Sequence, residues 1–409
     1  MLTLAFGISM IPAMNVAARS SVRIDTKSFP DVAFRKYISD NFDRDHDGSL
    51  SSKELADVEV IYLSGPAVKN LKGIGYFGSL KQLFLYKSEI TRLDVSKNTD
   101  LEQLTVRSNK IRALDLSKNK KLTHLDILED HALSGIDVSN CRKLKKFWFS
   151  MGWLKEITVS SGMKFESTNY GGNSTPTWSS SNKKVAFAKT GRSRDSKGSP
   201  ETKLILTAKK EGKAVLTEKW GWGKRKFKVR VLYKDVTDSS KFWFEPVYAM
   251  TDRGIVRGYE GKTRFKPGAK CTRAQLVMLL WRIKGCPKSK KYKNKFSDVK
   301  KTDYYYDAVR WASSKGIIKG YSDGKFRPQR MCSRRHVVTF LWKLAGRPEP
   351  KAPLNRFKDI KSTDFYYKAA LWATEQGIVE GFSDGTFRPN GICLRRQIVT
   401  YIYNYDRIM

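Results

Sequence analysis

The sequence predicts a multidomain chain: a short repeat solenoid with a helical cap, then a β-sandwich, then a mostly α-helical region of three similar units. Three observations support this prediction. The chain has 409 residues, which is more than one hydrophobic core usually serves. A motif of about 21 residues recurs between residues 80 and 159, and a longer unit recurs every 61 residues in the C-terminal third.

The first segment, residues 1–18, is typical of a secretory signal peptide. Its sequence MLTLAFGISMIPAMNVAA is apolar and ends in small residues, as a signal core and cleavage site do. The usual basic residues before the apolar core are missing, and a buried first helix is the alternative. The stretch is short for a membrane span and contains Pro12. We therefore expect a secreted product with no membrane span in the mature chain.

A calcium-loop pattern lies in residues 19–63, which we expect to form a helical cap. The run DRDHDGSLSSKE from Asp43 to Glu54 matches the EF-hand-like pattern D-x-D-x-D-G-x-x-S-x-x-E. Alternating acids place oxygens around one cation, and Gly48 permits the sharp turn. We expect one structural calcium ion, and an acidic turn without an ion is the alternative. The predicted ligands are Asp43, Asp45, Asp47, the carbonyl of Ser49, Ser51 and a bidentate Glu54.

Residues 64–162 carry the 21-residue motif. The run from Leu101 to Leu116 matches LxxLxLxxNxL, and further copies start at Leu80, Leu122 and Leu144. This motif resembles the leucine-rich repeat. One such unit cannot bury its apolar face alone, so neighbouring units stack into a solenoid. Large aromatic residues replace smaller ones near the end and either cap the stack or form an exposed patch: Phe147, Trp148, Phe149 and Trp153.

The stretch 163–234 predicts β-strands. Alternating apolar residues follow Trp178, Leu204 and Lys226 between turn residues. The order resembles a bacterial Ig-like β-sandwich domain, with AKKEGKAVLT as its most recognisable piece. We expect it to act as a spacer.

The C-terminal third contains three copies of one unit, at 235–285, 296–346 and 357–409. Phe265, Phe326 and Phe387 are landmarks that recur every 61 residues. Each copy predicts a helix ended by a glycine such as Gly316, a loop with Asp-Gly turn residues and a proline, and a second helix. Tryptophans on the predicted helices are more typical of a core than of a binding site: Trp281, Trp311, Trp342 and Trp372.

These copies resemble the surface-layer-homology (SLH) repeat. The matching motifs are GIIKGYSDGKFRP in the second copy, GIVEGFSDGTFRP in the third and CTRAQ in the first. The resemblance implies a three-pronged spindle with a central three-helix bundle. It also implies binding of an anionic secondary cell-wall polysaccharide between repeats, and a location at the cell wall or S-layer.

The expected polymer contacts lie at the start of each second helix and in the loop before it. Arg273, Arg334 and Arg395 fall in the first helical turn, where a planar guanidinium and free N–H groups can meet a carboxylate. A structural role at the helix end is the alternative. The loop candidates are Tyr321, Asp323, Gly324, Phe382, Asp384 and Gly385. Candidate rings for stacking on sugars are Trp243, Tyr259, Tyr305, Tyr321, Trp372 and Phe382.

Two departures from the family pattern affect these expectations. The first copy lacks the Ser-Asp-Gly turn and has Ala249 where the others have tryptophan, so its binding surface is expected to be weak or altered. The second and third copies have Arg335-His336 and Arg396-Gln397 where the family has Ala-Glu. The lost acid makes both positions more basic.

Charge and cysteine content narrow the function classes. The net charge of +38 predicts attraction to polyanions, although it says little about fold. Five cysteines are an odd number, and none forms a CxxC pair, so we expect neither a complete disulfide framework nor a zinc site.

We therefore predict a non-enzymatic cell-surface protein that is anchored by the SLH units, with a solenoid that binds an unknown protein or glycan. An SLH-anchored wall-modifying enzyme is one alternative. It is disfavoured because no segment remains for a catalytic domain, and HExxH does not occur. A basic nucleic-acid-binding protein is the other. It is disfavoured because the charge is spread over several domains and the N-terminus is typical of secretion, so we expect no specific nucleic acid.

Overall fold

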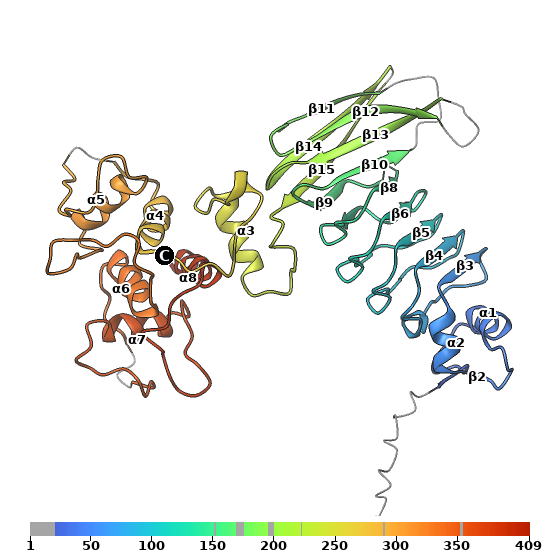
Figure 1. The fold of residues 1–409 in the computed structure, drawn as a ribbon, viewed down its shortest axis with the longest axis horizontal. Helices are drawn as coiled ribbons and strands as arrows, with labels where there is room; N and C mark the ends of the chain where they lie inside the picture. Colours follow the sequence, from blue (N-terminus) through green and yellow to red (C-terminus); the bar gives the residue numbers. More distant parts are fainter. Residues whose placement is uncertain are drawn as a thin grey trace, which may run out of the picture.

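The computed structural model describes residues 21–150, 153–168, 176–194, 200–221, 223–288, 291–351 and 355–409. The predicted signal peptide at 1–18 lies outside these residues. Figure 1 shows a small helical cap, a stack of short strands, a region of long strands and a helical region, in chain order.

The cap contains two helices, α1 (Val32–Phe42) and α2 (Ser52–Asp57), with β1 (Val22–Arg23) paired to β2 (Ser49–Leu50). The Asp31 carboxylate caps α1 by accepting a hydrogen bond from the Phe34 N–H at 2.9 Å. Phe34 and Ile38, four residues apart, are fully buried. They belong to the same hydrophobic core as the solenoid, so the cap covers the first end of that core.

The predicted solenoid is present, and its repeats are joined by parallel strands. Leu83 pairs with Leu104, and Leu104 pairs with Leu125, so equivalent leucines stack from turn to turn. These leucines are buried, whereas alternate side chains such as Phe84 are half-buried on the other face. The strands are β3 (Val60–Ser64), β4 (Gln82–Tyr86), β5 (Gln103–Arg107), β6 (His124–Ile127) and β8 (Lys146–Phe149).

A ladder of buried side chains satisfies backbone carbonyls in the turns. The Asn98 amide donates to the carbonyls of Ile74 and Phe77 at 2.9 and 2.8 Å. Asn119 repeats these bonds one turn later. Cys141 takes the equivalent place in the following turn, where its thiol donates to a backbone carbonyl at 3.7 Å. All five cysteines are free thiols, and burial raises the pKa of Cys141 to about 12.

The large aromatic residues near the end of the solenoid divide between the two expected roles. Phe147 and Phe149 are buried, and Phe147 packs against Phe165 with ring centroids 5.4 Å apart. Trp153 is 49% exposed and stacks on His131 at 4.5 Å.

The strands after the solenoid continue its two sheets. β10 (Lys164–Thr168) pairs with β8, and β13 (Pro200–Ala208) and β12 (Ala186–Arg194) extend the same eight-stranded sheet. The second sheet has five strands: β7 (Gly135–Asp137), β9 (Glu156–Ser160), β15 (Gly223–Leu232), β14 (Gly212–Trp220) and β11 (Thr177–Ser180).

One hydrophobic core runs from the cap through both sheets, from Phe29 to Val231. The predicted boundary between residues 162 and 163 therefore divides neither the sheets nor the core. The β-rich stretch is structurally part of the solenoid body, and its assignment as an Ig-like domain stays a prediction.

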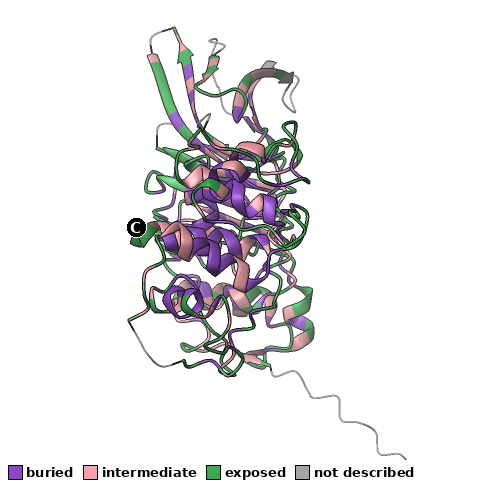
Figure 2. Cartoon of the chain, turned by 90° about the vertical axis from the view of Figure 1, so that its left-hand side faces the viewer, coloured by how far each residue is buried: buried purple, intermediate pink, exposed green. Residues whose placement is uncertain are grey.

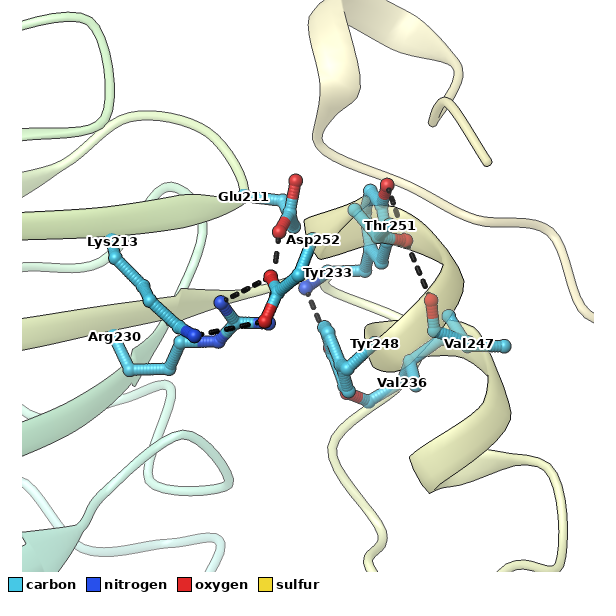
Figure 3. A network of polar contacts seen from close by, with 9 residues as sticks. All are labelled: Glu211, Lys213, Arg230, Tyr233, Val236, Val247, Tyr248, Thr251 and Asp252. Carbon is cyan, nitrogen blue, oxygen red and sulfur yellow. Dashed lines mark hydrogen bonds and ion pairs between the residues drawn. The ribbon is translucent and has the colours of Figure 1, made fainter. Parts of the chain in front are cut away.

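A second hydrophobic core starts at Leu232 and continues to Tyr405. Polar contacts join the two bodies where β15 meets α3 (Phe244–Asp252), as Figure 3 shows. Arg230 and Lys213 contact the Asp252 carboxylate at 2.7 and 2.8 Å. The Arg230 guanidinium also lies 5.0 Å from the Tyr248 ring centroid. The joint is therefore packed and hydrogen-bonded.

The C-terminal region is built from short helices joined by long loops. After α3 come α4 (Arg273–Ile283), α5 (Tyr306–Ser314), α6 (Arg334–Leu344), α7 (Tyr367–Glu375) and α8 (Arg395–Ile408). Figure 2 shows buried helical surfaces gathered at the centre of this region and exposed loops around it. Within the part of the chain that the structure describes, no helix is both long and apolar enough to cross a membrane.

Candidate functional site

The three C-terminal units interlock in a closed cycle. The first helix of each unit packs on the second helix of the preceding unit: α5 on α4, and α7 on α6. The cycle closes because α3 of the first unit packs on α8 of the third. At the centre, backbone N–H groups of Cys332, Cys393 and Cys271 donate in turn to the carbonyls of Cys271, Cys332 and Cys393 at 2.8, 2.9 and 3.3 Å.

The three predicted arginines connect successive units of this cycle. Arg273 donates from Nε to the Phe326 carbonyl at 3.0 Å. Arg334 makes the equivalent bond to the Phe387 carbonyl at 2.7 Å. Arg395 reaches back from the third unit to the first, where Nη2 donates to the Arg257 carbonyl at 2.7 Å. Each side chain therefore ties its own helix to the loop of the next unit.

These arginines are 3–6% exposed, and burial lowers the pKa of Arg273. Their guanidinium groups lie over aromatic rings, at 4.7 Å from the Phe326 and Phe387 centroids. These contacts support the structural role that the sequence left open. Direct contact with a polymer stays a prediction.

In the second and third units, the loop before the second helix exposes a cluster of charged and aromatic side chains. Asp323 forms an ion pair with Arg327 at 3.0 Å, and the Arg327 guanidinium lies 4.2 Å from the Tyr321 ring centroid. Gly324 has φ +71°, a conformation that glycine adopts at little cost. The loop residues predicted from sequence thus come together, with Arg327 as an additional member.

The third unit repeats this cluster 61 residues later. Asp384 pairs with Arg388 at 2.8 Å, and Arg388 lies 3.8 Å from the Phe382 ring centroid. Gly385, with φ +78°, closes the same turn. We call these two groups the loop clusters, made of Tyr321, Asp323, Gly324 and Arg327 in one unit, and Phe382, Asp384, Gly385 and Arg388 in the other.

The divergent first unit keeps a similar arrangement with different residues. Glu260 forms ion pairs with Lys266 and Arg264, both at 3.1 Å. The Lys266 ammonium lies 5.2 Å from the Tyr259 ring centroid. Glutamate and lysine therefore replace the aspartate and arginine, so an exposed cation over an aromatic ring is present in all three units.

Sequence reasoning missed the acids that hold these loops in place. Asp298 accepts hydrogen bonds from the N–H groups of Phe326 and Arg327 at 2.8 and 2.7 Å. Asp359 and Asp235 make the equivalent bonds in the other units. The repeat itself could have identified these acids, because Asp298 and Asp359 are separated by the same 61 residues as the other landmarks.

Two of the predicted stacking rings are buried and unavailable to a sugar. Tyr305 is 5% exposed and Trp372 is 4% exposed, because both pack in the core of the helical region. The exposed rings belong to neighbouring positions, one just before the first helix of each unit. These are Phe242, Tyr304 and Phe365, at 63–65% exposure.

The predicted calcium loop brings three acids together. Carboxylate oxygens of Asp43, Asp45 and Asp47 lie within 4.8 Å of one another. Asp43 is 4% exposed, and its Oδ1 has no hydrogen-bond partner in the described structure. A buried carboxylate oxygen without a partner is costly unless a cation approaches it. This donor set of hard oxygens fits calcium.

The other predicted ligands face different partners. Ser51 and Glu54 form the capping box of α2, with the Ser51 hydroxyl donating to Glu54 Oε2 at 2.7 Å. Glu54 Oε1 accepts from the Arg44 N–H at 2.8 Å. The Ser51 hydroxyl, ahead of the backbone N–H groups, lowers the pKa of Glu54. Ser49 donates its N–H to Asp47 at 2.7 Å.

Comparison with known proteins identifies the repeated C-terminal units. The family model described as S-layer homology domain matches residues 232–277, 295–337 and 356–398. An exoglucanase named XynX from Acetivibrio thermocellus is 30% identical over 183 residues, which cover 43% of this chain and 16% of that protein. A cellulosome-anchoring protein from the same organism is 27% identical over 155 residues, covering 36% and 34%.

The chain thus spans at most about a third of the length of these curated relatives. Among solved structures, the functional domain of InlJ from Listeria monocytogenes matches 35% of this chain and 39% of that chain. The sequence identity is 22% and the TM-score is 0.27.

Proposed function

We propose that this chain, which carries three S-layer homology domains, binds an anionic secondary cell-wall polysaccharide through them and does not catalyse a reaction. The three domains and the cell-surface relatives indicate association with the cell wall or cell surface. The protein would then hold its solenoid at that surface.

The observation that supports this proposal is the repeated exposure of a cation over an aromatic ring. Arg327 on Tyr321 and Arg388 on Phe382 present a guanidinium edge beside an apolar ring face. A guanidinium suits a carboxylate or phosphate of the polymer, and exposed rings such as Tyr304 and Phe365 suit the apolar face of a sugar. Three such surfaces on one rigid body allow several contacts to act together.

The test is a pull-down of the full chain with purified cell-wall sacculi in moderate salt, before and after chemical removal of the non-peptidoglycan polymer. We expect binding that survives salt and disappears on stripping. The variant Arg327→Ala/Arg388→Ala should bind more weakly than Lys300→Ala/Lys361→Ala, which removes the same charge from equivalent exposed positions. Salt-sensitive binding that ignores stripping would contradict the proposal.

We assign a display role to the solenoid, with its exposed sheet face as the binding surface for a protein or glycan. Tyr62, Phe84 and Tyr86 form a cluster with ring centroids 5.5–6.5 Å apart. Farther along the same sheet, Arg107 forms an ion pair with the buried Asp126 at 2.6 Å and lies 5.9 Å from the Trp148 ring centroid. Aromatic surface with fixed polar groups is typical of recognition sites.

For the cap we propose one structural calcium ion held by Asp43, Asp45 and Asp47. The unpartnered Oδ1 of Asp43 supports this assignment. The ion would neutralise three neighbouring carboxylates and fix the loop between α1 and α2. Rotation of the Glu54 side chain out of its capping box would complete the site. The environment of Glu54 would therefore change most on binding.

An enzyme with the same anchor is the competing function, because XynX is named an exoglucanase. The carboxylates that such an enzyme would use are Asp94, Asp115 and Asp137, which line a cavity of about 1150 Å³ on the solenoid. Each of them accepts the N–H of the serine two residues later at 2.8–2.9 Å, as expected for repeated turn residues. Incubation with wall glycans should release no reducing ends, and release that Asp137→Asn abolishes would establish the enzyme.

A further inference from the structure

A strongly basic pocket lies where the end of the solenoid meets the start of the helical region. Its volume is about 580 Å³. Five cationic side chains line it, and no acidic residue does: Arg142, Lys143, Lys145, Lys164 and Lys234. The pocket belongs mainly to the solenoid body, since only Lys234 falls within the residues matched to the S-layer homology domain.

The structure leaves these positive charges without compensation. None of the five forms an ion pair with a carboxylate among the described residues. Gly162 has φ +86°, and a Cβ at this position would lie 2.9 Å from Lys234 Cε and 3.2 Å from its Nζ. The absence of a side chain at Gly162 therefore lets the half-buried Lys234 lie across the pocket wall. Several like charges this close repel each other unless an anion joins them.

The pocket also contains a buried donor without a partner. Ser160, at the end of β9, is 1% exposed, and its Oγ has no hydrogen-bond partner in the described structure. The neighbouring Ser161 hydroxyl, by contrast, donates to the Thr263 carbonyl at 3.0 Å. An unmatched buried hydroxyl is unfavourable, and it is the kind of group that a bound oxyanion satisfies.

We propose that this pocket binds phosphate groups of an anionic cell-wall polymer, as a contact separate from the S-layer homology domains. Lysines and hydroxyls around a cavity larger than one small ion suit a phosphate with the chain that carries it. No aromatic ring lines the pocket, which disfavours a single-stranded nucleic acid held by base stacking. That the phosphate belongs to a wall polymer rests on the proposed function, whereas phosphate binding itself does not.

The experiment uses the full chain and isothermal titration with two probes, inorganic phosphate and a short polyglycerol phosphate. The variant Lys143→Gln/Lys145→Gln should lose about tenfold in affinity for the polymeric probe, since it removes two charged donors. Lys118→Gln/Lys120→Gln is the matched control: it removes the same charge from exposed solenoid positions outside the pocket and should bind like the wild type.

Ser160→Ala supplies a second readout that a purely structural role would not give. The hydroxyl has no partner to lose, so the melting temperature of the free protein should not fall, while affinity for the phosphate probes should. Equal affinity of the two double-lysine variants, or unchanged affinity of Ser160→Ala, would overturn the proposal that this pocket binds phosphate.

Further outcomes separate this proposal from wall anchoring by the helical units. Sacculi binding that persists in the pocket variants, with phosphate binding lost, supports two independent contacts. Phosphate binding that persists while sacculi binding fails would overturn only the wall assignment. A DNA oligonucleotide that binds with the affinity of polyglycerol phosphate, and with the same sensitivity to Lys143→Gln/Lys145→Gln, would overturn the polymer class.

Discussion

His336 caps the central helix of the second unit, and its replacement by glutamine should change how stability depends on pH. Its Nδ1 lies 2.8 Å from the Ser333 hydroxyl. The other two units use glutamine at the same place: Gln275 Oε1 accepts from the Thr272 N–H at 3.0 Å, and Gln397 Oε1 from the Leu394 N–H at 2.8 Å. His336→Gln therefore installs a cap that the fold already accommodates.

Burial first, and then the neighbouring Arg273, Arg335 and Arg330, lower the pKa of His336 from 6.5 to about 4. The unfolded chain therefore binds a proton that the folded chain excludes when the pH lies between these values. The stabilisation is complete above the unfolded pKa and is lost as the pH falls toward the folded pKa. The full difference corresponds to about 3 kcal/mol, with a slope of roughly 1.4 kcal/mol per pH unit.

The assay is urea unfolding of the full chain, followed by far-ultraviolet circular dichroism, at several values between neutral and acidic pH. Carboxylates titrate in both proteins, so the difference between wild type and His336→Gln isolates the histidine. At about pH 4.5 the wild type should have lost about 2–3 kcal/mol more than the variant. Parallel stability curves over the whole range would refute a neutral, desolvated His336.

Three other predictions test the cap, a loop and the joint between the two bodies. Saturating calcium should raise the melting temperature of the wild type but not of Asp43→Ala, and equal responses would contradict the metal loop. Gly320→Ala should cost about 1–3 kcal/mol of unfolding free energy, because the new Cβ would lie 2.6 Å from Phe296. Gly268→Ala, whose Cβ would meet only Arg396 Nη1 at an ordinary contact distance of 4.0 Å, should be neutral, and a loss as large as that of Gly320→Ala would remove the steric argument. Arg230→Ala should cost about 3 kcal/mol by leaving the buried Glu211 carboxylate without its ion-pair partner. Lys213→Ala, whose side chain is 69% exposed, should cost under about 1 kcal/mol, and equal losses would argue against a buried joint.

The periodic features of the fold were predictable from the sequence because a repeated local motif indicates each of them. The 21-residue motif predicted a solenoid of stacked units, in which leucines such as Leu83 and Leu104 lie side by side, and the spacing of 61 predicted the helical units. The alternating acids predicted the meeting of Asp43, Asp45 and Asp47. In each case the relevant partners lie at fixed short distances along the chain, so spacing alone places them together.

Features that depend on long-range pairing were not predictable in this way. The parallel pairing of Lys228 with Glu156 joins the β-rich stretch to the solenoid. No local sequence pattern predicts this pairing. The choice between adjacent rings also escaped the sequence: Tyr305 is buried and Tyr304 exposed, because helix direction after a loop decides which of two neighbours faces the core. Likewise, the hydrogen bonds of the buried Arg334 guanidinium were not predictable, because their acceptors are backbone carbonyls of the next unit.

The closed cycle of the three units has a consequence for how the anchor forms. The first helix, α3, has its packing partner in α8, and Arg253 pairs with Asp406 across 153 residues of sequence. Contacts between such distant segments form late, since a long loop must close first. The first unit therefore stays incomplete until the third has been synthesised. A chain that lacks α8 would leave α3 without its packing partner, so the ring of units closes only when its last helix has been made.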